Sequence, residues 1–226
     1  MAAVTDQVRA AWERIETGLR RVLPDSIPRL EEPADDAAID IVQAELGLAL
    51  PADFRASLLI HNGTSWGMPQ PLPMDQLYSA EEIVEATRMW RDNADDDSDF
   101  HDPGKLAYYI DHGMLRVDGP VHRLMGGEGR IVVATMNGDV WWLLDLDPAP
   151  GGTPGQVIRV DIECAEWDVL APSWTELLVR YARDLERFPE SELTIEPDLG
   201  PACEWGQGGS ERPAWLAGVS PVDPYP

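Results

Sequence analysis

Apolar residues recur at helical spacing over the first part of the chain. Positions 8, 11, 12, 15, 19 and 22 form one stripe, which predicts a helix that Thr5 caps and that ends before Pro24. Positions 39, 42 and 46 predict a second helix, from about Asp36 to a glycine stop at Gly47. Each stripe should face the protein core.

Two more helices are predicted before residue 92. Pro51 and Gly63 bracket the first, because proline suits the first helical position and glycine the position just past the end. Ser79 and Glu82 form a capping box, which predicts the other helix up to about Arg91. The acidic run that follows should end regular structure.

After residue 102 the pattern changes to short apolar runs broken by glycine, asparagine and aspartate, which is typical of antiparallel strands. Asn137-Gly138 favours a tight hairpin turn between two of them, and Ser173 should cap a closing helix that ends near Phe188. Helices followed by consecutive strands predict an α+β fold, with N-terminal helices packed on a mostly antiparallel sheet. The predicted strands are 131–134, 140–144, 156–160 and 167–170.

Two stretches rich in proline predict irregular structure. Residues 65–77 contain three prolines, which remove hydrogen-bond donors and fix the backbone, so we expect an exposed or half-buried loop. Residues 189–226 have no periodicity and predict an extended tail, packed on or trailing from a single domain over residues 1–188. The side chains that would hold a packed tail are Trp205, Trp215 and Leu216.

Trp141 and Trp142 occupy consecutive strand positions, so their rings should point to opposite faces of the sheet. One ring should face the core. The other is either covered by a helix or exposed to a partner, where tryptophan often dominates binding.

The chain carries 17 basic and 41 acidic residues, a formal net charge of −24. Such a surface repels nucleic-acid phosphates and anionic lipids, and it attracts a basic protein in a salt-sensitive way. The alternative is that the charge only keeps the protein soluble. With two cysteines, no leader-like start and no apolar run long enough to span a membrane, we expect a cytoplasmic protein.

No residue pattern predicts catalysis or a bound metal. The acidic run suits calcium in composition, but an EF-hand frame that starts at Asp95 has Phe100 where glycine is needed and Leu106 where glutamate is needed. The four histidines lack the i, i+4 pairing of a metal-binding helix, and His61 suits a helix C-terminus. We therefore expect a non-enzymatic protein with no cofactor and no metal.

Two motifs follow one another in the chain, and the pair is more specific than either alone. The first contains Glu45, Gly47, Leu50, Pro51, Phe54, Arg55, Asn62 and Gly63, and the second contains Gly138, Asp139, Leu144, Asp145, Pro148, Gly155, Gln156 and Val157. In these residues the chain resembles the SUKH superfamily of fungal cell-wall assembly regulators and bacterial toxin-neutralising proteins. The resemblance extends over roughly residues 4–185.

The resemblance implies partner binding through surfaces that vary between members, while the motif residues keep structural roles. Together with the charge, it predicts an immunity protein that neutralises a toxin, such as a basic nuclease, by stoichiometric binding. The alternative is a regulatory scaffold of the cell-wall regulator type, without a toxin partner. The predicted partner is a protein with a basic surface, and the residues predicted to contact it are Asp95, Asp96, Asp97, Asp99, Asp102, Asp139, Trp66 and Met68.

Overall fold

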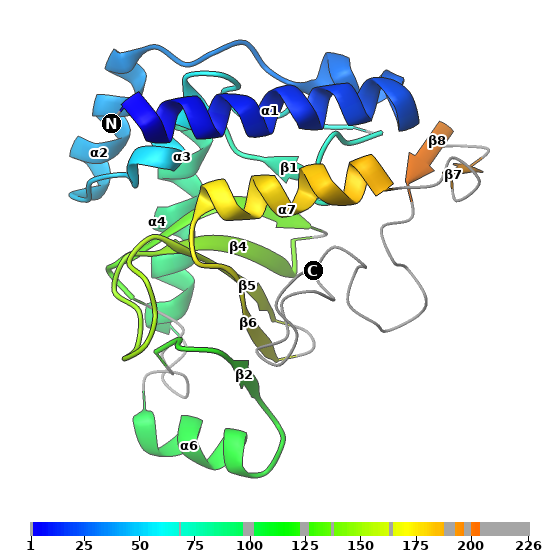
Figure 1. The fold of residues 1–226 in the computed structure, drawn as a ribbon. Coiled ribbons are helices and arrows are strands. Elements are labelled where there is room, and N and C mark those ends of the chain that lie inside the picture. The colour runs from blue at the N-terminus through cyan, green and yellow to red at the C-terminus, as the bar shows by residue number, and fades with distance from the viewer. Residues whose placement is uncertain are drawn as a thin grey trace.

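A six-stranded sheet lies at the centre of the fold, with its strands in the order β1-β3-β4-β5-β6-β2 (Figure 1). Neighbouring strands are antiparallel except β2 and β6, which are parallel. The strands are β1 Gln76–Leu77, β2 Arg116–Asp118, β3 Arg130–Met136, β4 Val140–Asp145, β5 Gln156–Asp161 and β6 Glu166–Ala171. The structure is a computed structural model that describes residues 2–67, 69–96, 102–122, 127–136, 138–162, 165–187, 193–196 and 200–203.

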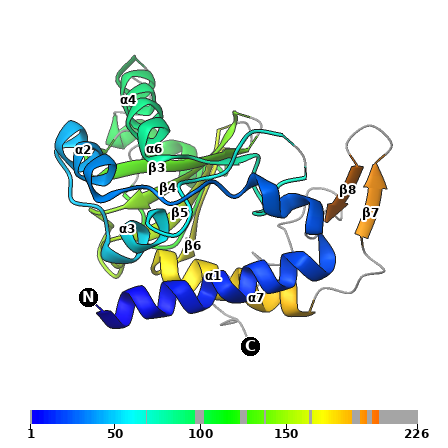
Figure 2. The same cartoon turned by 90° about the horizontal axis from the view of Figure 1, so that it is seen from above.

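Helices cover both faces of the sheet. α1 and α7 pack against each other on one side, and α6 lies on the other side (Figures 1 and 2). This arrangement confirms the predicted α+β class, with N-terminal helices, a mostly antiparallel sheet and a closing helix. The helices are α1 Ala2–Val22, the 3₁₀ helix η1 Pro24–Arg29, α2 Asp36–Leu46, α3 Ala52–Leu58, α4 Ala80–Asp96, α6 Pro103–Asp111 and α7 Trp174–Arg187.

The side chains of the central strands alternate between two apolar cores. Trp142 joins the core beneath α1 and α7, whereas Trp141 joins the core on the opposite face. There it packs against Trp90 of α4, with ring centroids 5.9 Å apart. Both rings are therefore buried in the sheet, and the alternative in which one tryptophan faces a partner is wrong.

Several helices and the β3–β4 hairpin begin or end where the local sequence predicted. The capping box is present, because the Ser79 main-chain N–H donates to Glu82 and the Glu82 N–H donates to the Ser79 hydroxyl. Gly47 ends α2 with a φ of +66°, and the Ser173 hydroxyl accepts a hydrogen bond from the first turn of α7. The β3–β4 hairpin forms with Met136 opposite Val140, as its turn residues predict.

Other element ends differ from the prediction. α1 begins at Ala2, so Thr5 lies inside the helix instead of capping it. α4 continues into the acidic run as far as Asp96, and the periodicity did not reveal the short helix α6 that follows at Pro103. Asp102 caps α6, and Pro103 occupies its first turn, so the local signal for this helix was an Asp-Pro pair.

The centre of the proline-rich loop lies inside the protein, which corrects the expectation of an exposed or half-buried segment there, whereas residues 65–67 at its start are exposed or half-buried as predicted. Residues 69–74 are buried, and Leu72 and Met74 belong to the main core. The Tyr181 hydroxyl of α7 donates to the carbonyl of Pro71 at 2.7 Å. Because proline has no N–H, this backbone can be buried with fewer donors left unpaired.

Gly63 does not stop α3, which ends at Leu58. Its φ is +84°, and it passes directly against the backbone that leads from β1 to α4. A Cβ at this position would lie 2.6 Å from the carbonyl oxygen of Leu77. Close approach of two main-chain segments therefore explains this glycine better than helix termination.

The part of residues 189–226 that the structure describes contains two paired strands, β7 Leu193–Glu196 and β8 Gly200–Cys203. Trp205, Trp215 and Leu216 lie outside the described residues, so the division into one domain and a tail stays a prediction. None of the described helices has an apolar stretch long enough to cross a membrane.

Candidate protein-binding site

Four carboxylates and two arginines gather where the β3–β4 and β5–β6 turns meet. Strand register places Val140 opposite Asp161, and Asp161 opposite Glu166. The hairpin tip is joined to the next turn, because the main-chain N–H of Ile162 donates to the carbonyl of Asp139 at 2.9 Å. We call this cluster the acidic end of the sheet; it comprises Asp139, Asp161, Glu166, Asp168, Arg116 and Arg159.

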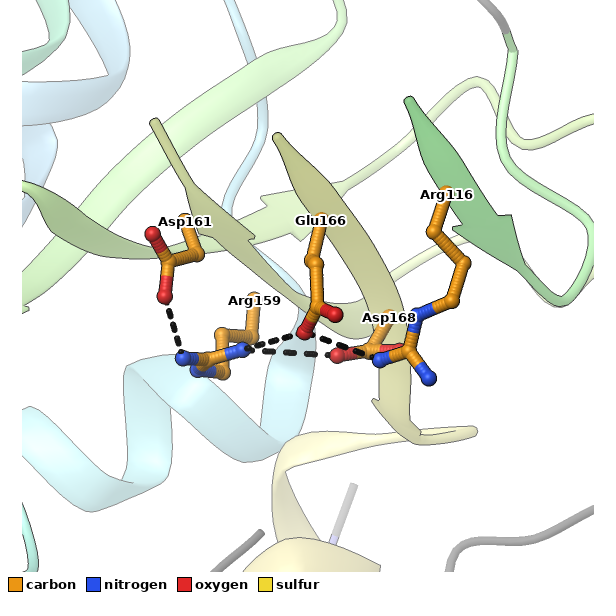
Figure 3. Close-up of polar contacts among 5 residues, drawn as sticks. All are labelled: Arg116, Arg159, Asp161, Glu166 and Asp168. Carbon is orange, nitrogen blue, oxygen red and sulfur yellow. Dashed lines mark hydrogen bonds and ion pairs between the residues drawn. The ribbon is translucent and has the colours of Figure 1, made fainter. Parts of the chain in front are cut away.

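Asp168 lies at the centre of the ion pairs in this cluster (Figure 3). Its two oxygens contact Arg116 at 3.3 Å and Arg159 at 3.4 Å. Arg159 also pairs with Asp161 at 2.8 Å, and Arg116 with Glu166 at 2.9 Å. The carboxylates thus hold both guanidinium groups against the sheet, and four acids against two arginines leave an excess of two negative charges.

Exposure divides the cluster into an inner and an outer part. The side chain of Asp168 is only 5% exposed, whereas those of Glu166 and Arg116 are 33% and 49% exposed. A buried carboxylate needs charged partners, which the two arginines supply. Asp168 therefore organises the cluster, and Glu166 with the half-buried Asp139 presents negative charge to solvent.

Asp139 was predicted from the sequence as a contact residue, whereas the other five members of the cluster were not. Their signal in the sequence is the spacing of charged residues in β5 and β6. Arg159 and Asp161 are two positions apart, as are Glu166 and Asp168, and this spacing puts each pair on one face of its strand. Arg116 has no such signal, because β2 joins the sheet only through its parallel pairing with β6.

The other predicted contact residues lie on separate elements. Asp95 and Asp96 belong to the last turn of α4, while Asp97, Asp99 and Met68 lie outside the described residues. Asp102 uses a carboxylate oxygen to accept the Gly104 N–H at 2.8 Å. The 68% exposed Trp66 lies beside η1, where Arg29 donates to its carbonyl.

The motif residues form internal connections. The Asn62 side chain accepts the Ala80 N–H at 2.8 Å, which caps α4 from 18 residues away. Asp145 is buried and accepts a hydrogen bond from the Gln156 side chain at 3.1 Å, and its carbonyl accepts the Gly155 N–H. Burial raises the pKa of Asp145, and the nearby Arg130 counteracts part of that rise.

Four further motif residues lie in α2, in α3 or in the link between them. Glu45 is exposed and pairs with Arg88 of α4, while Leu50 and Phe54 are in the main core. Pro51 directly precedes α3, and it also packs near Gly155, where an added Cβ would lie 3.2 Å from the proline ring. These contacts join the first motif to the second.

Two side chains acquire partners that the sequence did not suggest. The ring of His61 packs edge-on against Trp12 at 4.9 Å and contacts Glu16 at 3.2 Å, so it interacts with α1 instead of with the end of α3. Asp53 accepts the Thr175 main-chain N–H at 2.9 Å and so links α3 to the first turn of α7. Among the described residues no three His, Cys, Asp or Glu side chains gather as metal ligands.

Comparisons with known proteins show which sequences this chain is similar to. The model of the SMI1 / KNR4 family (SUKH-1) matches residues 33–180. The chain is 29% identical over 210 residues to the cell wall biosynthesis/cell cycle regulator smi1 of Schizosaccharomyces pombe, a match that covers 90% of this chain and 42% of the relative. It is 26% identical over 231 residues to the KNR4/SMI1 homolog of Kluyveromyces lactis, covering 78% and 43%.

A shorter similarity links the chain to F-box only protein 3 of Homo sapiens, with 30% identity over 81 residues that cover 34% of this chain and 17% of the relative. The chain thus spans less than half the length of the curated relatives it matches. The family model covers more than half of the chain and includes both motifs. This protein therefore belongs to the SMI1/KNR4 (SUKH-1) family.

Proposed function

We propose that this protein is a non-enzymatic, cytoplasmic immunity protein, which neutralises a toxin with a basic surface by stoichiometric binding. The observation that carries the proposal is the acidic end of the sheet, where four carboxylates outnumber two arginines and the partly exposed Glu166 and Asp139 lie at its surface. Asp168 fixes the two neighbouring arginines, so the pattern of charge is set before a partner arrives.

Charge complementarity gives this binding its physical basis. A nuclease holds nucleic-acid phosphates with lysines and arginines, and the same basic cleft is attracted to a chain of net charge −24. Association should be fast at low ionic strength and should slow as salt screens the attraction. Occupation of the cleft then blocks the toxin without any chemical step.

The test is co-expression with the product of the neighbouring gene in a sensitive host, followed by co-purification. Wild-type protein should rescue growth and form a stable complex. The double variant Asp139→Lys/Glu166→Lys should weaken that complex by about tenfold or more at low salt. Asp6→Lys/Glu13→Lys, which makes the same change in net charge on an exposed part of α1, is the matched control and should bind normally.

A regulatory scaffold without a toxin partner is the second candidate. The similarity to a fungal protein named as a cell wall biosynthesis and cell cycle regulator, which extends over 90% of this chain, favours it. Growth that is unaffected by the neighbouring gene product, together with the absence of a complex, would exclude the immunity function and favour the scaffold.

A further inference from the structure

A second surface lies on the other edge of the molecule, between α2 and α4, which pack side by side (Figure 2). They enclose a groove with a volume of about 840 Å³. Its floor is apolar, formed by the buried Val42 and the half-buried Val84. Its walls carry Ile41 and Met89, which are 60% and 43% exposed.

Exposed aliphatic side chains on two adjacent helices are costly in water unless something covers them. On α4 the groove residues Glu81, Val84, Glu85, Arg88, Met89 and Asp92 recur every three or four positions, so they form one continuous face. The residues that α4 buries against the protein, such as Ile83 and Trp90, form a different face. On this second face of α4, Met89 is exposed and Val84 is only partly covered by the main core, with charged side chains beside them.

The charge around the groove specifies what can occupy it. Its rim carries the carboxylates of Glu45, Glu81, Glu85 and Asp92 and one guanidinium, Arg88, which is already paired with Glu45. Four acids against one arginine leave an excess of three negative charges. A second copy of this acidic chain would bring like charges together, whereas a basic segment would neutralise them.

We propose that the α2–α4 groove binds a helical segment of a partner protein, with two or three apolar side chains on one face and lysines or arginines beside them. A third helix fits a groove between two helices, because its apolar ridge packs between theirs. This inference rests on the proposed protein-binding function and adds the chemistry of the partner segment. The groove shares no residue with the acidic end of the sheet, since its lining comes from α2 and α4, whereas the acidic end comes from the β3–β4 turn and from β5, β6 and β2.

The probe is a synthetic helical peptide of about 14 residues, with leucines at i, i+3, i+4 and i+7 and lysines at most other positions. Its counterpart replaces each lysine by glutamate. Methyl NMR of the full chain labelled at its seven methionines reports the site of binding, with the Met89 signal assigned from Met89→Leu. The lysine peptide should shift the Met89 methyl signal, and the glutamate peptide should bind at least about tenfold more weakly.

Two surface variants separate the groove from non-specific attraction. Ile41→Glu should weaken lysine-peptide binding by about tenfold or more, because it places a charge on the apolar wall. The matched control is Met114→Glu, since Met114 is 59% exposed and lies beyond α6, away from the groove; it should bind normally. Equal affinities for the two variants, or an unchanged Met89 signal, would overturn the inference.

The two proposals fail in different ways. If the protein rescues the host but does not bind the peptide, the inference about the groove is overturned and the proposed function stands. If the peptide binds at Met89 but the wild-type protein does not rescue the host, the immunity function is overturned and the inference about the groove stands.

Discussion

Gly47 and Gly63 both adopt left-handed backbone conformations but differ in what surrounds them. The φ angles are +66° and +84°. A Cβ on Gly47 would meet nothing within 4 Å, whereas one on Gly63 would lie 2.6 Å from both Leu77 O and Ser79 N. The first glycine provides only a backbone angle, and the second also provides space for another segment of main chain.

We therefore predict unequal costs for the two alanine variants. Gly47→Ala should lower the free energy of unfolding by about 1 kcal/mol, the cost of a left-handed alanine. Gly63→Ala should lower it by at least about 3 kcal/mol, because strand β1 and the start of α4 must also move. Urea unfolding of the two variants compares these costs, and equal losses would contradict the packing role of Gly63.

Asp184 on α7 has a buried carboxylate oxygen that finds no hydrogen-bond partner among the described residues. Burial raises its pKa from 3.8 to about 7, and the charge of Arg187 offsets only part of this rise. Because the folded state holds the proton more tightly than the unfolded chain, ionisation costs stability. The cost is absent below pH 3.8, grows as the pH rises and is complete above about 7.

The variant Asp184→Asn should remove this cost. With a discount for partial exposure, we expect a gain of about 1 kcal/mol in the free energy of unfolding at about pH 8. Near pH 4 the gain should vanish, since the aspartate is then largely protonated in the folded state. Denaturant unfolding at the two pH values measures it, and an equal gain at both would show that ionisation is not the cause.

At the scale of elements, α4 completes the hydrogen bonding of β3. The strand has a bulge between Val132 and Ala134, and the main-chain N–H of Val132 donates to the Thr87 hydroxyl at 3.0 Å. Thr87 is fully buried at this contact. The helix thus satisfies a donor at a bulge in the ladder and fixes its own position along the strand.

Replacement of Thr87 by valine keeps the shape but leaves the Val132 N–H unpaired in the core. We predict that Thr87→Val lowers the free energy of unfolding by about 1 to 3 kcal/mol. Thr17→Val is the matched control, because the exposed Thr17 hydroxyl donates to the Glu13 carbonyl of its own helix and its loss should cost about 0.5 kcal/mol or less. Thermal and urea unfolding compare them, and equal costs would refute the bulge contact.

At the scale of the whole molecule, net charge opposes folding. The 41 acidic and 17 basic residues repel one another on balance, and ion pairs such as Arg14 with Glu186 are exposed and worth little. The same charge that suits a basic partner therefore lowers the stability of the free protein.

Added salt should consequently stabilise this protein. Raising NaCl from about 0.02 M to about 0.5 M shortens the screening length several-fold and should increase the free energy of unfolding by about 1 kcal/mol. Urea unfolding at a series of salt concentrations measures the trend. A decrease with salt would mean that the ion pairs at the acidic end of the sheet outweigh the general repulsion.

The sequence by itself determined the features that depend on near neighbours. Helical periodicity predicted α1 and α2, the capping box gave the start of α4, and Asn137-Gly138 predicted the β3–β4 hairpin. The two motifs identified the family, and the residue count fixed the charge. Each of these signals involves residues within a few positions of one another, or needs no spatial information.

Only the tertiary structure decided the features that depend on contacts between residues far apart in the sequence. The prolines of residues 69–73 could signal an exposed loop, and packing beneath Tyr181 buried them instead. Arg116 reaches Glu166, 50 residues away, through a parallel pairing that neither segment encodes alone. The same holds for the α2–α4 groove, because a surface shared by two helices exists only once they pack. The apolar pattern of each helix is compatible with many packing partners and does not specify this one.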